Sequence, residues 1–195
     1  MQRTARILLH ERETAQLGTN VSSQNPSMTI QLCTYDELTP LQHEGLRAIE
    51  VEPEQMAFSG DIHSALHSLP AHSHPDIQGF TLLKEQLPVA FLLLKRRSFL
   101  AHWADSNSAT LHAFQVDKRL QGQGLGKVCL QELRVSVKQL WPEISQLMLS
   151  VSPLNAPALA FYLSQGWVEC GEAYRGERCL KLPLAHSPNA PQHAH

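Results

Sequence analysis

The chain has 195 residues, 43% of them hydrophobic, which is enough for one ordinary domain with its own apolar core. Its 16 basic and 18 acidic side chains leave a formal net charge of −2, which excludes nucleic-acid binding driven by bulk positive charge. No apolar run approaches the roughly 20 residues that span a bilayer. The N-terminal stretch, with glutamates directly after a short apolar core, is unlike a secretory signal. We therefore predict a cytoplasmic protein without a nucleic-acid or membrane partner.

The two ends of the chain differ in composition from its middle. Residues 1–27 are polar and aperiodic, so we expect a disordered or loosely attached extension. Residues 185–195 are rich in proline and histidine, and we expect them to form a disordered tail. The packed domain is predicted to cover residues 28–184.

The first elements of that domain follow from its hydrophobic pattern. Residues 29–34 alternate as a strand. Asp36 is a plausible N-cap for the helix that follows. The apolar stripe of this predicted helix consists of Leu38, Leu41, Leu46 and Ile49.

Residues 50–61 are acidic and begin with Glu50, Glu52 and Glu54, beside Pro53, which breaks a helix. The segment is either a solvated loop or an acidic lip that binds a cationic substrate. Residues 61–69 then predict a short second helix, and several histidines follow. Two of them share metal-pair spacing, but no third ligand confirms the site, so we expect exposed loop histidines and no metal.

The central part of the chain predicts a hairpin, a further strand and a long helix. Residues 80–84 and 89–95 form the hairpin, and residues 109–116 form the next strand. Residues 125–140 form the helix, with one apolar face on the sheet. Cys129 lies on that face and is interpreted as a core thiol, not a nucleophile.

The last part predicts a strand over residues 146–151, a helix over residues 156–165, and a closing hairpin. The hairpin strands are residues 167–174 and 177–184, around a turn at Arg175-Gly176.

That turn sets the expected pairing of the hairpin's two cysteines. It places Cys170 opposite Lys181 and not opposite Cys179, so a disulfide between the two cysteines is not expected. The four cysteines of the chain also form no Cys-x-x-Cys pair, and a reduced chain is the default.

A glycine-rich loop joins the strand at residues 109–116 to the long helix, with Gly122, Gly124 and Gly126 in five residues. Glycine allows close backbone approach, and a helix start presents free N–H groups, so the loop predicts an anion site, usually for phosphate. The loop lacks the Gly-Lys-Ser/Thr of a P-loop and the glycine spacing of a dinucleotide fingerprint.

Two segments resemble motifs of the GNAT superfamily of N-acetyltransferases. Gln121, Gly124 and Gly126 match the Gln/Arg-x-x-Gly-x-Gly/Ala loop that binds the pyrophosphate of acetyl-CoA. Residues 155–167 resemble the family's Asn-x-x-Ala-x-x-x-Tyr-x-x-x-Gly-Phe, with Trp167 in place of phenylalanine. The predicted element order over residues 28–184 is also the GNAT order. The resemblance implies an α/β (α+β) fold, with a mixed, mostly antiparallel sheet of about seven strands and about four flanking helices.

Shorter matches point to two amine-acetylating subfamilies. Pro53-Glu54-Gln55-x-x-Phe58 and the pairs Gly171-Glu172 and Gly176-Glu177 are similar to segments of spermine/spermidine-type enzymes. Leu111-His112-Ala113 resembles a segment of arylalkylamine N-acetyltransferases. The two subfamilies acetylate different primary amines, so the acceptor stays open.

The resemblance assigns roles to individual residues. His112 is the candidate base, on a strand face shared with Thr110 and Phe114 by the period of two, and Glu52 or Glu54 is the alternative base or binds the substrate. Tyr162 is the candidate that hydrogen-bonds the leaving sulfur. A buried histidine and a core aromatic are the structural alternatives for His112 and Tyr162. The residues expected to bind acetyl-CoA are Phe114, Val116, Gln121, Gly122, Gln123, Gly124, Gly126, Lys127 and Asn155.

The sequence therefore predicts an acetyl-CoA-dependent N-acetyltransferase that acts on a small primary amine, by direct attack of the amine on the thioester. A protein N-terminal acetyltransferase and a non-catalytic acyl-CoA-binding regulator are the alternatives. The resemblance also allows a homodimer, because dimers are common in the superfamily.

Overall fold

The computed structural model describes residues 29–184. The predicted extension and tail, residues 1–27 and 185–195, lie outside the described residues. Within the described part, a seven-stranded sheet has the order β1-β2-β3-β4-β5-β7-β6. Its strands are β1 (Ile30–Thr34), β2 (Ile77–Lys84), β3 (Leu87–Lys95), β4 (Ser108–Val116), β5 (Gln146–Val151), β6 (Val168–Glu172) and β7 (Arg178–Pro183). The helices are α1 (Pro40–Leu46), α2 (Pro53–Ser59), α3 (Ile62–His67), α4 (Leu125–Leu140) and α5 (Ala156–Ser164).

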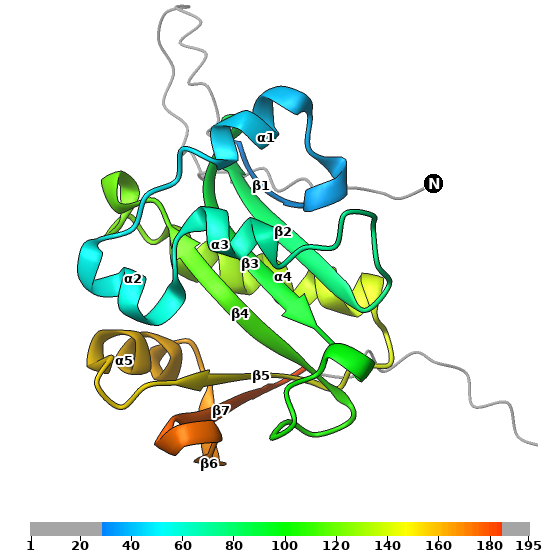
Figure 1. The fold of residues 1–195 in the computed structure, drawn as a ribbon, viewed down its shortest axis with the longest axis vertical. Coiled ribbons are helices and arrows are strands. Elements are labelled where there is room, and N and C mark those ends of the chain that lie inside the picture. Colours follow the sequence, from blue (N-terminus) through cyan, green and yellow to red (C-terminus); the bar gives the residue numbers. More distant parts are fainter. Residues whose placement is uncertain (1–28, 185–195) are drawn as a thin grey trace, which may run out of the picture.

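Helices cover both faces of the sheet. In Figure 1, α3 lies in front of β3, with α1 above it and α2 to its left, while α4 lies behind the strands. The larger core lies between the sheet, α4 and α5, and includes Leu133, Leu147 and Trp167. A smaller core lies under α1 and α3 and includes Leu46, Phe91 and Leu93. The mixed, mostly antiparallel fold predicted from the sequence is confirmed.

One pair of neighbouring strands is parallel, and it is short. β4 and β5 pair only at Ser108–Gln146, Ala109–Leu147 and Thr110–Met148, although both strands continue beyond these residues. Figure 1 shows β4 and β5 separating from this point, with α5 at the far end of β5. Every other neighbouring pair in the sheet is antiparallel.

β4 contains a bulge at the place where the two strands separate. Its register against β3 shifts between Leu93–His112 and Phe91–Gln115, so β4 holds one extra residue. Ala113 has a positive φ of 49°, which accommodates that residue. The expectation that His112 and Phe114 share a face is therefore wrong: Phe114 packs against the core of α4 and α5, whereas His112 lies opposite Leu93 of the other core.

The N-terminal helix differs from its prediction. Asp36 belongs to a 3-10 turn, and the N-cap of α1 is Thr39, whose hydroxyl accepts a hydrogen bond from the Gln42 amide. Pro40 takes the first helical position, where its missing N–H costs nothing. This later start shortens the helix, and Leu41 of the predicted apolar stripe is 76% exposed.

The acidic segment forms an exposed helix and not the solvated loop that is one of its two interpretations. The other interpretation, an acidic lip for a cationic substrate, stays a prediction. Pro53 begins α2 and does not interrupt a helix, for the same reason as Pro40. Glu52 is the N-cap, and Gly60 ends the helix with a φ of 67°. None of the seven residues of α2 is buried.

The closing hairpin has a different register from the one predicted. Val168, not Cys170, lies opposite Lys181, and Gly171 lies opposite Cys179. The register shifts between Glu169 and Gly171, because a bulge inserts Cys170 into β6. Both cysteines are free thiols in the structure.

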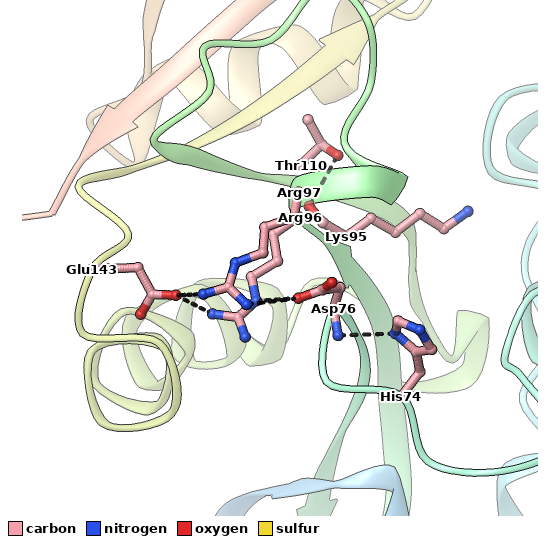
Figure 2. Close-up of polar contacts among 7 residues, drawn as sticks. All are labelled: His74, Asp76, Lys95, Arg96, Arg97, Thr110 and Glu143. Atoms are coloured by element: carbon pink, nitrogen blue, oxygen red, sulfur yellow. Dashed lines mark hydrogen bonds and ion pairs between the residues drawn. The ribbon is translucent and has the colours of Figure 1, made fainter.

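A buried ion-pair network fixes the end of β3 to the end of α4 (Figure 2). The Arg96 guanidinium donates to Asp76 at 3.0 Å and to Glu143, and lies 4.4 Å from the centre of the Trp141 ring. Arg97 is more exposed and pairs with the same two carboxylates, with Asp76 at 3.5 Å and with Glu143 at 3.0 Å. Arg96 is 6% exposed and Asp76 is 9% exposed, so this pair is protected from water.

Replacing Arg96 should destabilise the fold far more than replacing Arg97. Arg96→Met leaves the buried Asp76 charge without its main partner and should lower the free energy of unfolding by about 3 kcal/mol. Arg97→Met removes an exposed pair and should cost less than about 1 kcal/mol. Urea unfolding of both variants measures the difference, and equal losses would contradict the network's importance.

Candidate active site

The separation of β4 from β5 leaves one edge of β4 without a strand partner. Pairing with β5 stops at Thr110, while pairing with β3 on the other side continues to Val116. Backbone N–H and C=O groups of such an edge require partners, and an extended ligand with amide groups can pair with them as another strand would. The edge leads directly to the glycine-rich loop.

The glycine-rich loop has the backbone that an anion site requires. Gly122 and Gly124 both have a φ of +77°, which favours glycine, and a Cβ at either position would meet no atom within 4 Å. The space beside both residues is therefore open to a ligand. Gly124 is also the N-cap of α4, so the free N–H groups of the first helical turn begin here.

Gly126 is a glycine for a different reason. A Cβ at this position would lie 3.2 Å from the ring of Phe161, so the absence of a side chain lets α4 and α5 approach closely. The Phe161 ring is also near Phe114 of β4, with a centroid distance of 6.3 Å. α5 is thus packed beside both the unpaired edge and the loop.

The remaining predicted loop residues differ in their surroundings. The Gln121 side chain donates to the Val116 carbonyl at 2.9 Å, which ties the loop to the end of β4. Gln123 is exposed and accepts a hydrogen bond from Lys84 at 3.3 Å. Lys127 is exposed, in the first turn of α4, where its charge is available to an anion.

Two glutamines that the sequence analysis missed hold α2 against these elements. The Gln55 amide oxygen accepts from Gln121 Nε2 at 2.8 Å, which joins α2 to the loop. Gln115 is 2% exposed and donates to the carbonyls of Ser59 and Gly60, both at 3.2 Å. For Gln115, the sequence offers a signal of this role. It is a polar residue inside an apolar strand, and a buried glutamine needs hydrogen-bond partners.

His112 is held by a chain of hydrogen bonds. Its Nε2 lies 2.8 Å from the Thr110 hydroxyl, which in turn lies 3.3 Å from the Lys95 carbonyl. The carbonyl can only accept, and the hydroxyl has one proton to donate. The arrangement that satisfies all three groups therefore has Nε2–H donating to Thr110, which leaves the Nδ1 lone pair of His112 free.

Burial, with a smaller contribution from the positive charge of Lys95, lowers the pKa of His112 to about 4. The imidazole is therefore neutral at pH 7 and can accept a hydrogen bond through Nδ1. Glu52 and Glu54 do not contribute to this shift. Both carboxylates are exposed. The ammonium of Lys118 pairs with Glu50 at 2.9 Å, which raises the pKa of Lys118, and the charge of Glu52 adds to that effect.

Tyr162 lies among aromatic rings, with Phe161 at 5.4 Å and Trp167 at 5.6 Å between centroids. Burial raises the pKa of its hydroxyl well above the ordinary value, with a smaller contribution from Cys129. The group is therefore a neutral hydrogen-bond donor across the physiological range. Asn155, seven residues earlier, is the N-cap of α5 and accepts from the Ala158 amide at 3.3 Å.

A scan against protein-family models matches one family to this chain. The acetyltransferase (GNAT) family model covers residues 41–167, which is more than half of the chain. The chain belongs to the GNAT acetyltransferase family. A search of curated proteins finds no match.

Solved structures support the GNAT fold at low sequence identity. The GNAT domain of S. lividans PAT has a TM-score of 0.62 at 17% identity, covering 81% of this chain and 92% of that one. An acetyltransferase from Thermus thermophilus has a TM-score of 0.58 at 23% identity, covering 80% and 97%. The ribosomal-protein-S18-alanine N-acetyltransferase from Escherichia coli has a TM-score of 0.51 at 19% identity, covering 85% and 99%.

Within residues 29–184, none of the helices combines the length and the apolar character that a bilayer span needs. Within the same residues, no three His, Cys, Asp or Glu side chains form a group that could hold a metal ion. His67 Nδ1 instead contacts the His63 carbonyl at 3.0 Å.

Two matched glycine substitutions, one inside the loop and one outside it, separate the loop's part in ligand binding from the general effect of backbone strain. Gly124→Ala should weaken coenzyme A binding by about tenfold or more, because it strains the loop that we expect to present N–H groups to the phosphates. Gly166→Ala introduces the same kind of strain at a φ of +86°, at the end of α5, and should leave affinity unchanged. Calorimetric titration of both variants with coenzyme A measures this, and equal affinities would contradict the assignment.

The low pKa of His112 predicts a pH dependence of stability. Below pH 6.5 the unfolded chain binds a proton at this histidine that the folded chain does not bind until about pH 4. The unfolding free energy should therefore fall as pH falls from 6.5 to 4, by up to about 3 kcal/mol from this residue. Urea unfolding at both ends of this range should show a smaller fall for His112→Gln than for the wild type. Parallel curves would show that His112 titrates normally.

Proposed function

We propose that the chain is an acetyl-CoA-dependent N-acetyltransferase whose acceptor is a small primary amine. The observation that carries the proposal is the unpaired edge of β4, which leads into the glycine-rich loop and the start of α4. This arrangement suits a long ligand with amide groups at one end and phosphates at the other. A neutral histidine and a neutral tyrosine on neighbouring elements suit proton handling during acyl transfer.

The residues present fit the co-substrate. Backbone groups of Phe114 and Val116 would pair with its pantetheine arm, with Asn155 nearby on α5. Its pyrophosphate would be held by Gln121, Gly122, Gln123, Gly124, Gly126 and Lys127. When bound, acetyl-CoA supplies an acetyl group activated as a thioester, so no cysteine or serine nucleophile is needed from the chain.

The acceptor amine must lose its proton before or during attack. A primary ammonium with a pKa of about 10.4 is neutral in roughly one molecule in two thousand at pH 7, which costs about 4.5 kcal/mol. His112, with a pKa of about 4, is too weak a base to remove that proton outright. It acts by accepting a hydrogen bond at Nδ1 and takes the proton only as the new N–C bond makes the nitrogen more acidic. Glu52 or Glu54 is the alternative base for the first deprotonation.

Tyr162 acts on the leaving side of the reaction. Its raised pKa makes full proton transfer to a thiolate unfavourable, because a thiol's pKa is only about 8.5. A hydrogen bond to the charge that develops on sulfur is the contribution that this hydroxyl makes.

A protein N-terminus is a second candidate acceptor, favoured by the surface of α2. Met56 and Phe58 are 45% and 44% exposed, beside the acidic Glu52 and Glu54. Apolar side chains next to carboxylates fit a cationic peptide better than a small amine. Turnover of acetyl-CoA with a panel of polyamines, arylalkylamines and peptides decides between the two, and coenzyme A binding without any turnover would indicate a regulator instead.

Neither catalytic candidate should make a pH-dependent contribution above about pH 6 with the best acceptor found. His112→Ala should lower kcat/KM by about 10²–10⁴-fold across this range, because the histidine stays neutral and takes the amine's proton only once attack has begun. A loss that shrinks as pH rises would instead mean that His112 removes the ammonium proton first. Tyr162→Phe should lower kcat/KM by an amount that stays constant over the same range, since the leaving sulfur is affected and not the amine.

Exposed residues of the same types serve as controls for these profiles. His63→Ala and Tyr174→Phe should leave kcat/KM unchanged, because both side chains lie on the surface. A loss below about threefold for His112→Ala at every pH would make that histidine structural. Full activity of Tyr162→Phe would remove the role of its hydroxyl.

A further inference from the structure

Two cysteines of the closing hairpin lie in direct contact. The Sγ atoms of Cys170 on β6 and Cys179 on β7 are 2.7 Å apart. Cys170 is exposed, whereas Cys179 is 4% exposed. The proposed acetyl transfer uses neither thiol, so this pair has no assigned role.

The contact depends on the bulge in β6. Cys170 and Gly171 together oppose Cys179, so the extra residue directs the Cys170 side chain toward its neighbour across the strands. Gly171 has a φ of +124°, which a residue with a side chain rarely adopts, and its glycine therefore permits the bulge. The ion pair between Glu169 and Arg178, at 2.8 Å, supports the same hairpin beside the bulge.

We propose that Cys170 and Cys179 form a reactive dithiol site that a low-molecular-weight disulfide, such as oxidised glutathione, converts to an intramolecular disulfide. The sulfurs already face one another across adjacent strands, so closure requires little movement of the backbone. One sulfur is open to solvent for the first reaction, and the other is adjacent for the second.

The exchange balances in two steps. The Cys170 thiolate attacks one sulfur of the glutathione disulfide, which forms a mixed disulfide and releases one glutathione thiolate. Cys179 then loses its proton, attacks the Cys170 sulfur and displaces the second glutathione thiolate. The two cysteines are oxidised by two electrons, and one glutathione disulfide is reduced to two thiols.

The surroundings of the two thiols determine which of them reacts first. Burial and the contact with Cys170 raise the pKa of Cys179 to about 12, with Asp105 adding to the effect and Lys181 opposing it. Cys179 is therefore a poor first nucleophile in water and acts only on a sulfur already next to it. The other two cysteines are buried, and burial raises the pKa of Cys33 to about 11 and that of Cys129 further. They serve as unreactive internal controls.

The new bond would affect the strand that follows the Tyr162 helix. Trp167 contacts Tyr162 and directly precedes β6, and Cys179 lies opposite Ser150 of β5. A cross-link at the bulge would hold β6 on β7 and reduce the freedom of the unfolded chain. The oxidised chain should therefore melt several degrees higher than the reduced chain.

The test uses the full chain, first reduced and then incubated with oxidised glutathione. Intact mass should fall by the mass of two hydrogen atoms, and non-reducing peptide mapping should join Cys170 to Cys179. Cys179→Ser should instead retain one glutathione on Cys170, because the second step has no attacking thiol. Cys170→Ser, a change at an exposed position, should gain neither glutathione nor a disulfide.

Three results would overturn the proposal. One is a wild-type chain that shows no mass change, and another is a wild-type chain that keeps a bound glutathione. The third is a disulfide or adduct at Cys33 or Cys129 in place of the predicted pair. Because mass is the readout, the test succeeds or fails independently of acetyltransferase activity.

Discussion

The candidate site depends on the loss of pairing between β4 and β5 after Thr110. A continuous parallel pair would satisfy the backbone of both strands and leave no place for a ligand. The separation instead exposes one edge of β4, brings Phe114 and Phe161 together beside it, and lets the strand run into the glycine-rich loop. The bulge at Ala113 accompanies the separation and places His112 and Phe114 on opposite faces of β4.

The helices on both faces keep these elements in position. Gln115 and Gln55 attach α2 to β4 and to the glycine-rich loop, so the acidic helix is held beside the candidate site at both of its ends. Gly126 allows α5 to pack against the start of α4, and this packing places Tyr162 of α5 in the same region. At the opposite end of β3 and α4, the Arg96 network fixes the sheet to the helix behind it.

Periodic segments could be predicted from the sequence, and irregular ones could not. The bounds of α4 and β5 agree with their predictions, because a stripe of period 3.6 and a short apolar run are direct signals. The error at Phe114 comes from a bulge, which inserts one residue and reverses the faces that follow. The error at Cys170 has two causes, because the turn is longer than the predicted Arg175-Gly176 and pairs Glu172 with Arg178, and a bulge then inserts Cys170. A proline predicts a break in a helix, but Pro53 lies in the first turn of α2, which accepts proline. The roles of the site residues stay predictions, since they rest on a ligand's position.

The most direct test of the account is hydrogen exchange of backbone amides with and without coenzyme A. If the unpaired edge of β4 and the glycine-rich loop bind the ligand, amides of residues 113–116 and 122–127 should exchange more slowly when it is added. Amides of β2 and of the β3 segment paired with it should change little, since their partners are already within the sheet. Protection confined to another surface, or none at saturating coenzyme A, would contradict the placement of the site.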